Sequence, residues 1–132
     1  MNYKNILLNK INAKKTTIGI IGLGYVGLPL AGVFAKRKFN VIGFDIDVQK
    51  IQMLKRGKSY IRHIQDDLLK SINKKFIATA DFTNIKNVDI IIICLPTPLT
   101  RKKTPDLSFI TSTLKIIKKF LKKGQIIVLE SS

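Results

Sequence analysis

The chain has 132 residues, of which 45% are apolar, so it can form one domain with a hydrophobic core but not two ordinary domains. Its longest apolar run, at 88–95, has the length of a strand and falls well short of the ~20 residues that a membrane span needs. A single cysteine excludes an internal disulfide framework and a multi-cysteine zinc site, whereas the net charge of +16 is compatible with a nucleic-acid partner.

The first half of the chain predicts a βαβ unit. Residues 1–16 have no apolar stretch ahead of a small-residue cleavage site, so we expect a short, partly helical lead-in and a cytoplasmic protein. Residues 17–21 are β-branched and apolar, which predicts a buried strand. Apolar residues then recur at helical spacing over 25–37, and residues 40–45 predict a second strand. This order is typical of a parallel, right-handed crossover.

The second half continues the alternation of helices and strands. Asp47 is the expected N-cap of a helix that ends near Arg56, and a further helix is expected at 65–73. Strands are expected at 76–79 and at 88–94. The latter is apolar on both faces, as in the middle of a parallel sheet.

A proline-containing loop separates the fourth strand from the last helix. Asp106 is expected to cap a helix over 107–122, and residues 125–131 predict a fifth strand. The fold class is therefore α/β: a Rossmann-like, doubly wound parallel sheet of order 3-2-1-4-5. It spans 17–132 and ends before the sixth strand of that fold.

Gly22, Gly24 and Gly27 form the spacing G-x-G-x-x-G between the first strand and the first helix. In that order, such glycines permit a tight turn, let the backbone approach a pyrophosphate, and let the helix pack closely on the sheet. The backbone N–H groups of Tyr25 and Val26 are expected to face the phosphates from the helix N-terminus. The flanking strand and helix favour a dinucleotide site over a ligand-free turn.

Asp45, at the end of the second strand, is the acidic residue that such a site needs. Its carboxylate would accept hydrogen bonds from the ribose hydroxyls of the cofactor and would repel a 2′-phosphate. Because Ile46 offers no compensating guanidinium, NAD is predicted over NADP. Lys50 lies one turn into the next helix and could either reach the same end of the cofactor or lie on a solvated helix face.

Neither Cys94 nor His63 is expected to act in catalysis. Cys94 lies in the most apolar strand with no histidine near it in the sequence, and burial raises the pKa of a thiol. His63 lies in a polar, loop-like stretch where a surface position is more common. We therefore predict no catalytic residue and no metal site in this chain.

The basic residues are spread over every predicted helix and loop and are not interleaved with aromatic residues that would stack bases. We interpret the charge as a lysine-rich surface, with neither nucleic acid nor membrane as a partner. The positive field would still attract an anionic substrate or cofactor. The alternative is an RNA- or DNA-binding domain, whose binding would fall steeply with salt.

Five stretches between residues 18 and 132 together resemble the N-terminal NAD-binding domain of the UDP-glucose/GDP-mannose dehydrogenases. They are GLGYVGLPLA, GFDID, KIQMLKRGKSYI, IIICLPTPL and VLES. GYVGLPLA and PTPL together are much more specific than the glycines alone. RGKSYIRHI and CLPTPLTRKKTPDLSFI are most similar to the branch that oxidises UDP-N-acetylhexosamines, which includes the UDP-N-acetylglucosamine and UDP-N-acetylmannosamine 6-dehydrogenases.

The resemblance implies an oxidation of a sugar C6 alcohol to a carboxylate by two NAD molecules in sequence, through a thiohemiacetal and a thioester on an enzyme cysteine. Val26, Asp45 and Lys50 match cofactor-binding positions of the family. Thr97 falls where cofactor and substrate meet, at the end of the fourth strand.

Two further positions come from the same resemblance. Ser132 stands where the family usually has a threonine near the nicotinamide, and Arg101 is a weaker candidate for contact with an anionic nucleotide sugar. The catalytic cysteine, the central helix that makes relatives dimeric and the UDP-binding domain would all follow Ser132.

We therefore expect the NAD-binding half of a UDP-sugar 6-dehydrogenase, not catalytically competent alone, whose last strand has an exposed flank. The alternative is a stand-alone, non-catalytic nucleotide-binding module or the remnant of an interrupted gene.

Overall fold

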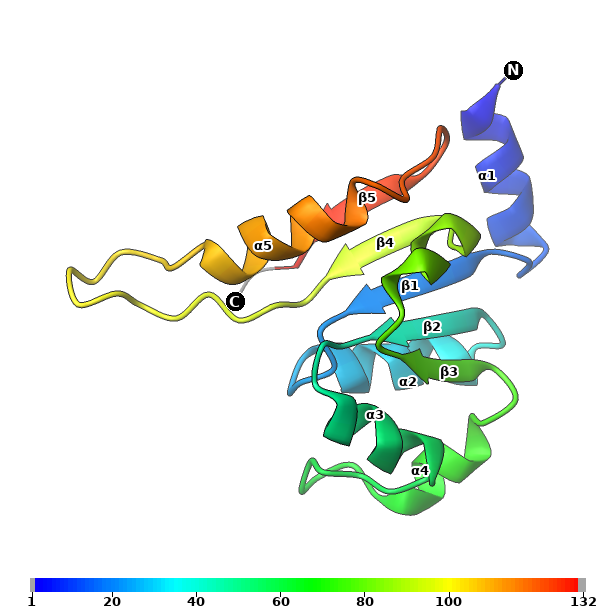
Figure 1. The fold of residues 1–132 in the computed structure, drawn as a ribbon. Coiled ribbons are helices and arrows are strands. Elements are labelled where there is room, and N and C mark those ends of the chain that lie inside the picture. The colour runs from blue at the N-terminus through cyan, green and yellow to red at the C-terminus, as the bar shows by residue number, and fades with distance from the viewer. Residues whose placement is uncertain (1, 131–132) are drawn as a thin grey trace.

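The computed structural model describes residues 2–130 and contains a five-stranded parallel sheet (Figure 1). Its strands are β1 (Thr17–Ile21), β2 (Asn40–Phe44), β3 (Phe76–Thr79), β4 (Ile90–Ile93) and β5 (Ile126–Leu129). Their order is β3-β2-β1-β4-β5, and every neighbouring pair is parallel. The predicted fold class and strand order are confirmed.

Helices cover both faces of the sheet (Figure 1). They are α1 (Tyr3–Asn12), α2 (Gly27–Lys36), α3 (Val48–Lys55), α4 (Asp66–Ser71), the 3-10 helix η1 (Phe82–Asn87) and α5 (Ser108–Ile117). One buried cluster joins β1, β2 and β3 to α2, α3 and α4, and a second joins the opposite face to η1 and α5. Of the described helices, none is long and apolar enough to cross a membrane.

The N-terminal lead-in is a helix that is fastened to the start of β1. Asn2 caps α1 by accepting a hydrogen bond from the Asn5 N–H. The Lys10 ammonium forms an ion pair of 3.0 Å with the Asp89 carboxylate, whose other oxygen accepts a hydrogen bond of 2.9 Å from the Thr17 N–H. Asp89 therefore ties α1 to both β1 and the start of β4.

Two predictions at the end of the chain need correction. The last helix ends at Ile117 and not at 122, because the chain turns there: the Phe120 N–H donates to the Ile117 carbonyl only three residues back, and the Lys122 N–H donates to the side-chain oxygen of Gln125. Asp106 is not the N-cap, which is Leu107. The Asp106 carboxylate nonetheless accepts a hydrogen bond of 2.9 Å from the Ser108 N–H, so it still binds the first turn.

The expected exposure of the last strand is confirmed. All four residues of β5 are exposed, by 39 to 54% of their surface, although all four are large and apolar. β5 is paired only on its β4 side in the described sheet. An edge strand with this composition favours association with other chains.

Candidate functional site

Six of the predicted site residues line a hollow of about 500 Å³ at the carboxyl ends of the central strands. This is where ligands bind in open α/β sheets, because β1 and β4 carry their crossovers in opposite directions. The hollow is lined by Gly22, Leu23, Gly24, Tyr25, Val26, Asp45, Ile46, Lys50, Cys94, Leu95, Pro96, Phe109 and Glu130.

The three glycines have three different surroundings. Gly22 has a φ of +94°, and a Cβ on it would lie 2.8 Å from the Cys94 carbonyl oxygen. A Cβ on Gly27 would lie only 1.7 Å from the Gly22 carbonyl oxygen, so the start of α2 sits directly against the turn. A Cβ on Gly24 would meet no atom within 4 Å. Two of the glycines thus let the turn close, and the third leaves open space beside the hollow.

Two side chains hold the backbone of Leu23, the residue between the first two glycines. The Asp45 carboxylate accepts a hydrogen bond of 3.0 Å from the Leu23 N–H. The Tyr60 hydroxyl donates to the Leu23 carbonyl oxygen. The second Asp45 oxygen accepts a bond of 2.9 Å from the Asp47 N–H, which orients the carboxylate at the end of β2.

The N–H groups that follow Leu23 are free to bind a ligand. Among the described residues, the N–H groups of Gly24, Tyr25 and Val26 have no hydrogen-bond acceptor. They lie at the N-terminus of α2, whose dipole favours negative charge. This arrangement can bind the oxygens of a phosphate or pyrophosphate, and the open space at Gly24 lets such a group come close.

The Lys50 ammonium is held on the same side of the site. It lies 5.4 Å from the centroid of the Tyr60 ring, which is the geometry of a cation–π contact. Burial and then the charges of Asp45 and Asp47 raise the pKa of the Tyr60 hydroxyl, so this group stays protonated and remains a donor at ordinary pH. Lys50 faces the hollow and does not extend freely into solvent.

Sequence reasoning missed the part played by the segment 59–64. Besides the bond of Tyr60 to Leu23, its His63 ring stacks on the exposed Tyr25 ring, with centroids 6.3 Å apart and planes at 26°. The segment therefore contacts the glycine turn at two points. Its only signal in the sequence was the family-like string RGKSYIRHI, and nothing local predicted contacts to residues so far back in the chain.

An apolar compartment of about 200 Å³ adjoins the hollow on the side of α5. The two share Gly22, Asp45 and Phe109, among others, and Phe44, Phe82 and other apolar residues line the compartment. A flat, apolar group attached to a sugar that binds Asp45 could enter it. The combined space suits a ligand with an aromatic end, a sugar and phosphates.

Three of the other predicted residues, Gly27, Thr97 and Arg101, are absent from the described lining of the hollow. Arg101 is in the turn of the loop after β4, closed by a hydrogen bond from the Lys103 N–H to the Thr100 carbonyl, and this loop extends beyond the sheet in Figure 1. Ser132 lies outside the described residues.

Cys94 lines the hollow but is poorly suited to act as a nucleophile. The residue is buried, and burial followed by the charge of Glu130 raises the pKa of its thiol to about 11. The thiolate is the reactive form, so little of it exists near neutral pH. The described residues contain no cluster of side chains that could hold a metal ion.

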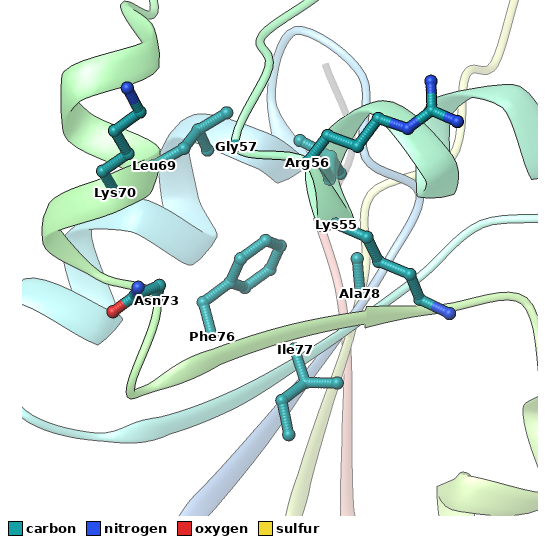
Figure 2. A pocket seen from close by; sticks show the side chains of 10 residues that line it. Lys55, Arg56, Gly57, Leu69, Lys70, Asn73, Phe76, Ile77 and Ala78 are labelled. Carbon is teal, nitrogen blue, oxygen red and sulfur yellow. The ribbon is translucent and has the colours of Figure 1, made fainter.

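A second hollow, of about 360 Å³, lies between α3, α4 and the edge strand β3 (Figure 2). Its apolar lining includes Phe76, and the cationic ends of Lys55, Arg56 and Lys70 point outward from it in Figure 2. Lys55 and Lys70 belong to the last turns of α3 and α4, and Arg56 follows α3 as its C-cap, so these cations offset the negative ends of the helix dipoles. This hollow shares no lining residue with the predicted site, and its charges already have a local explanation.

Known proteins share this fold and sequence over most of the chain. Residues 16–132 match the model of the UDP-glucose/GDP-mannose dehydrogenase family, NAD binding domain. UDP-N-acetyl-D-mannosamine dehydrogenase of Yersinia pestis is 38% identical over 88% of this chain and 28% of its own length. NDP-N-acetyl-D-galactosaminuronic acid dehydrogenase of Ralstonia nicotianae is 36% identical over 88% of this chain and 27% of its own length.

Solved structures agree with the sequence comparison. UDP-D-ManNAc dehydrogenase from Pyrococcus horikoshii superposes with a TM-score of 0.81 at 31% identity, over 88% of this chain and 28% of that one. A ternary complex of GDP-mannose dehydrogenase from Pseudomonas aeruginosa superposes with a TM-score of 0.80 at 30% identity, over 86% of this chain and 28% of that one.

This chain therefore spans about 28% of the length of the relatives it matches. The expected likeness to the N-acetylhexosamine branch is confirmed by these relatives, and the cofactor of the matched domain is NAD. The chain belongs to the UDP-glucose/GDP-mannose dehydrogenase family and contains that family's NAD-binding domain.

Proposed function

We propose that this chain is the NAD-binding part of a dehydrogenase that oxidises the C6 alcohol of a UDP-N-acetylhexosamine to a carboxylate. One observation carries the proposal: three unpaired N–H groups at the start of α2 and the Asp45 carboxylate line the same hollow. The substrate class is supported by the names of the relatives, which act on N-acetylated nucleotide sugars. NAD, when bound, would accept hydride from the alcohol.

Each residue of the hollow has a proposed part in binding. The N–H groups of Gly24, Tyr25 and Val26 would bind the pyrophosphate, and Gly24 would give it room. Asp45 would accept hydrogen bonds from the ribose hydroxyls with lone pairs not used by Leu23 and Asp47. Lys50 would add positive charge near the phosphates.

Catalysis is proposed to need residues beyond this chain. Cys94 has too high a thiol pKa for the covalent steps implied by the family, so the nucleophile would come from the rest of the polypeptide. The proposed contribution of these 132 residues is to bind and orient NAD. Thr97 is proposed to lie near the boundary between the cofactor and the sugar, and Arg101 near the sugar nucleotide.

The test is calorimetric titration of the purified chain with NAD and with NADP, each at two salt concentrations. We expect NAD to bind at least tenfold more tightly than NADP. Asp45→Ala should weaken NAD about tenfold or more, because hydrogen bonds to a charged acceptor contribute roughly 1.5–3 kcal/mol. Gly24→Val should also weaken NAD, by filling the open space beside the turn.

Asp67→Ala is the matched control, because it removes an exposed carboxylate of α4 that lies outside the hollow. It should bind NAD as the unaltered chain does. Full NAD affinity in both Asp45→Ala and Gly24→Val would refute the assigned site. Binding that ignores Asp45 and falls steeply with salt would instead support the nucleic-acid alternative.

A further inference from the structure

The carbonyl of Leu23 and the N–H of Gly24 belong to one peptide unit. This unit is planar and trans, so its C=O and N–H point in opposite directions. The Tyr60 hydroxyl is the only described donor to the Leu23 carbonyl oxygen. Fixing that carbonyl therefore fixes the direction of the Gly24 N–H, which has no acceptor of its own.

We propose that Tyr60 is a positioning residue for cofactor binding, which aims the Gly24 N–H at the pyrophosphate through the Leu23 carbonyl and holds Lys50 at the site with its ring. The inference rests on the proposed function, since it assigns a role within the NAD site. Tyr60 belongs to the loop between α3 and α4, 37 residues from Leu23. It does not line the described hollow, so it acts through other residues.

Two observations show that the contact is built into the site. The Leu23 side chain is fully buried, so its backbone cannot turn easily to find water if the Tyr60 hydroxyl is removed. Asp45 holds the Leu23 N–H from the other side of the residue, 3.0 Å away. The peptide units before and after Leu23 are thus each fixed by one side chain, from two separate elements.

The ring of Tyr60 has a second task that can be separated from the first. It lies 5.4 Å from the Lys50 ammonium, which lines the hollow. Tyr60→Phe removes the hydroxyl and keeps the ring, whereas Tyr60→Leu removes both. If the hydroxyl and the ring both contribute, Tyr60→Phe should lose only the effect of the bond to Leu23, and Tyr60→Leu should also lose the effect of the contact with Lys50.

The test compares three ligands, NAD, ADP and adenosine, by calorimetry. Because the turn faces the phosphates, Tyr60→Phe should weaken NAD and ADP by about two- to tenfold, the effect of one hydrogen bond. Adenosine lacks phosphates and should bind unchanged. A merely structural role of Tyr60 would weaken all three ligands together. Equal affinity of Tyr60→Phe and the unaltered chain for ADP would overturn the proposal.

Lys50→Gln separates the role of the ring. Tyr60→Leu should weaken ADP more than Tyr60→Phe does, and this extra loss should vanish in the Lys50→Gln background. An extra loss that persists without Lys50 would overturn the second half of the proposal. Tyr3→Phe is the matched control, because Tyr3 lies on α1, outside the hollow.

A measurement without ligand keeps the inference apart from the proposed function. Amide exchange at Leu23 and Leu28, whose N–H groups donate to the Asp45 carboxylate and to the Gly24 carbonyl, should be faster in Tyr60→Phe than in Tyr3→Phe, because the turn loses its anchor. Unchanged exchange at these amides would overturn the inference even if NAD binds. Absence of NAD binding by the unaltered chain, with faster exchange in Tyr60→Phe, would refute the proposed function and leave the anchoring by Tyr60 supported.

Discussion

The same chemical change at two glycines of the turn should have opposite effects. Gly24→Ala should leave the free energy of unfolding unchanged or raise it by roughly 0.4–1 kcal/mol, because the unfolded chain loses freedom. Gly24 is not among the glycines with positive φ, and its new Cβ would meet nothing within 4 Å. The added methyl would occupy the open side of the turn, so NAD affinity should fall about tenfold or more.

Gly27→Ala should instead destabilise the fold. Its Cβ would lie 1.7 Å from the Gly22 carbonyl oxygen and 2.8 Å from the carbon of that carbonyl. Both contacts are with backbone, so no side-chain rotation relieves them, and α2 must move away from β1. We expect a loss of at least about 2–3 kcal/mol, a large part of the 5–15 kcal/mol that stabilises a typical domain.

Urea unfolding followed by circular dichroism measures the stabilities, and calorimetry measures NAD binding. The ranking of the two variants is the decisive result. Gly24→Ala should be at least as stable as the unaltered chain but bind NAD weakly, whereas Gly27→Ala should be far less stable. A stable Gly27→Ala would refute the close packing of helix and turn. A Gly24→Ala variant that keeps full NAD affinity would refute the assignment of the pyrophosphate to this turn.

Three further predictions concern other parts of the molecule. Iodoacetamide should alkylate Cys94 slowly at pH 8, with a rate that rises toward pH 11, and alkylation at pH 8 as fast as in a free cysteine would contradict the pKa of about 11. Because that pKa lies above the ordinary thiol pKa of 9.0, the thiol favours the folded state below pH 9 and this contribution is lost between pH 9 and 11. Asp89→Ala should lower the free energy of unfolding by about 1–2 kcal/mol, because the Thr17 N–H loses its acceptor. Lys10→Ala should lower it by less than about 1 kcal/mol, because the Lys10 side chain is 45% exposed. Equal losses for the two variants in urea unfolding would contradict this difference. Ile127→Lys on β5 should reduce self-association in sedimentation experiments, and unchanged association would mean that this exposed strand is not the contact.

The sheet was predictable because its signals are local and agree with one another. Buried parallel strands are short apolar runs in the sequence, and the glycine turn marks the end of the first strand and the start of the helix that follows it. The helix ends were less predictable, because they depend on distant partners. The chain leaves α5 in a tight turn after Ile117, and the Gln125 side chain then accepts the Lys122 N–H that a longer helix would have used. The 3-10 helix at 82–87 is too short to show a periodic pattern: Asp81 caps it, and its Phe82 ring packs on Phe44 from a distant part of the chain.

The residues of the site also differ in whether local sequence or distant contacts place them. Gly22, Gly24, Gly27 and Asp45 could be found because their spacing reflects the geometry of one βαβ unit. Tyr60 could not, because a tyrosine in a loop shows nothing of a bond to a carbonyl 37 residues away. Asp45 was expected only to meet a ribose, and the structure gives it a second task in holding the Leu23 N–H. For a residue such as Asp45, the sequence predicts the contact with the ligand but not the hydrogen bond that holds the turn.

The preference for NAD over NADP must arise from Asp45 and not from the overall charge. A chain of net charge +16 attracts NADP more than NAD, because NADP carries an additional phosphate. This long-range attraction is screened beyond about 8–10 Å at physiological salt. A 2′-phosphate beside Asp45 would meet a like charge at about 4 Å, where repulsion is of order 4 kcal/mol at an effective dielectric constant of about 20. The preference for NAD should therefore grow as salt rises, since salt removes the attraction and leaves much of the local repulsion.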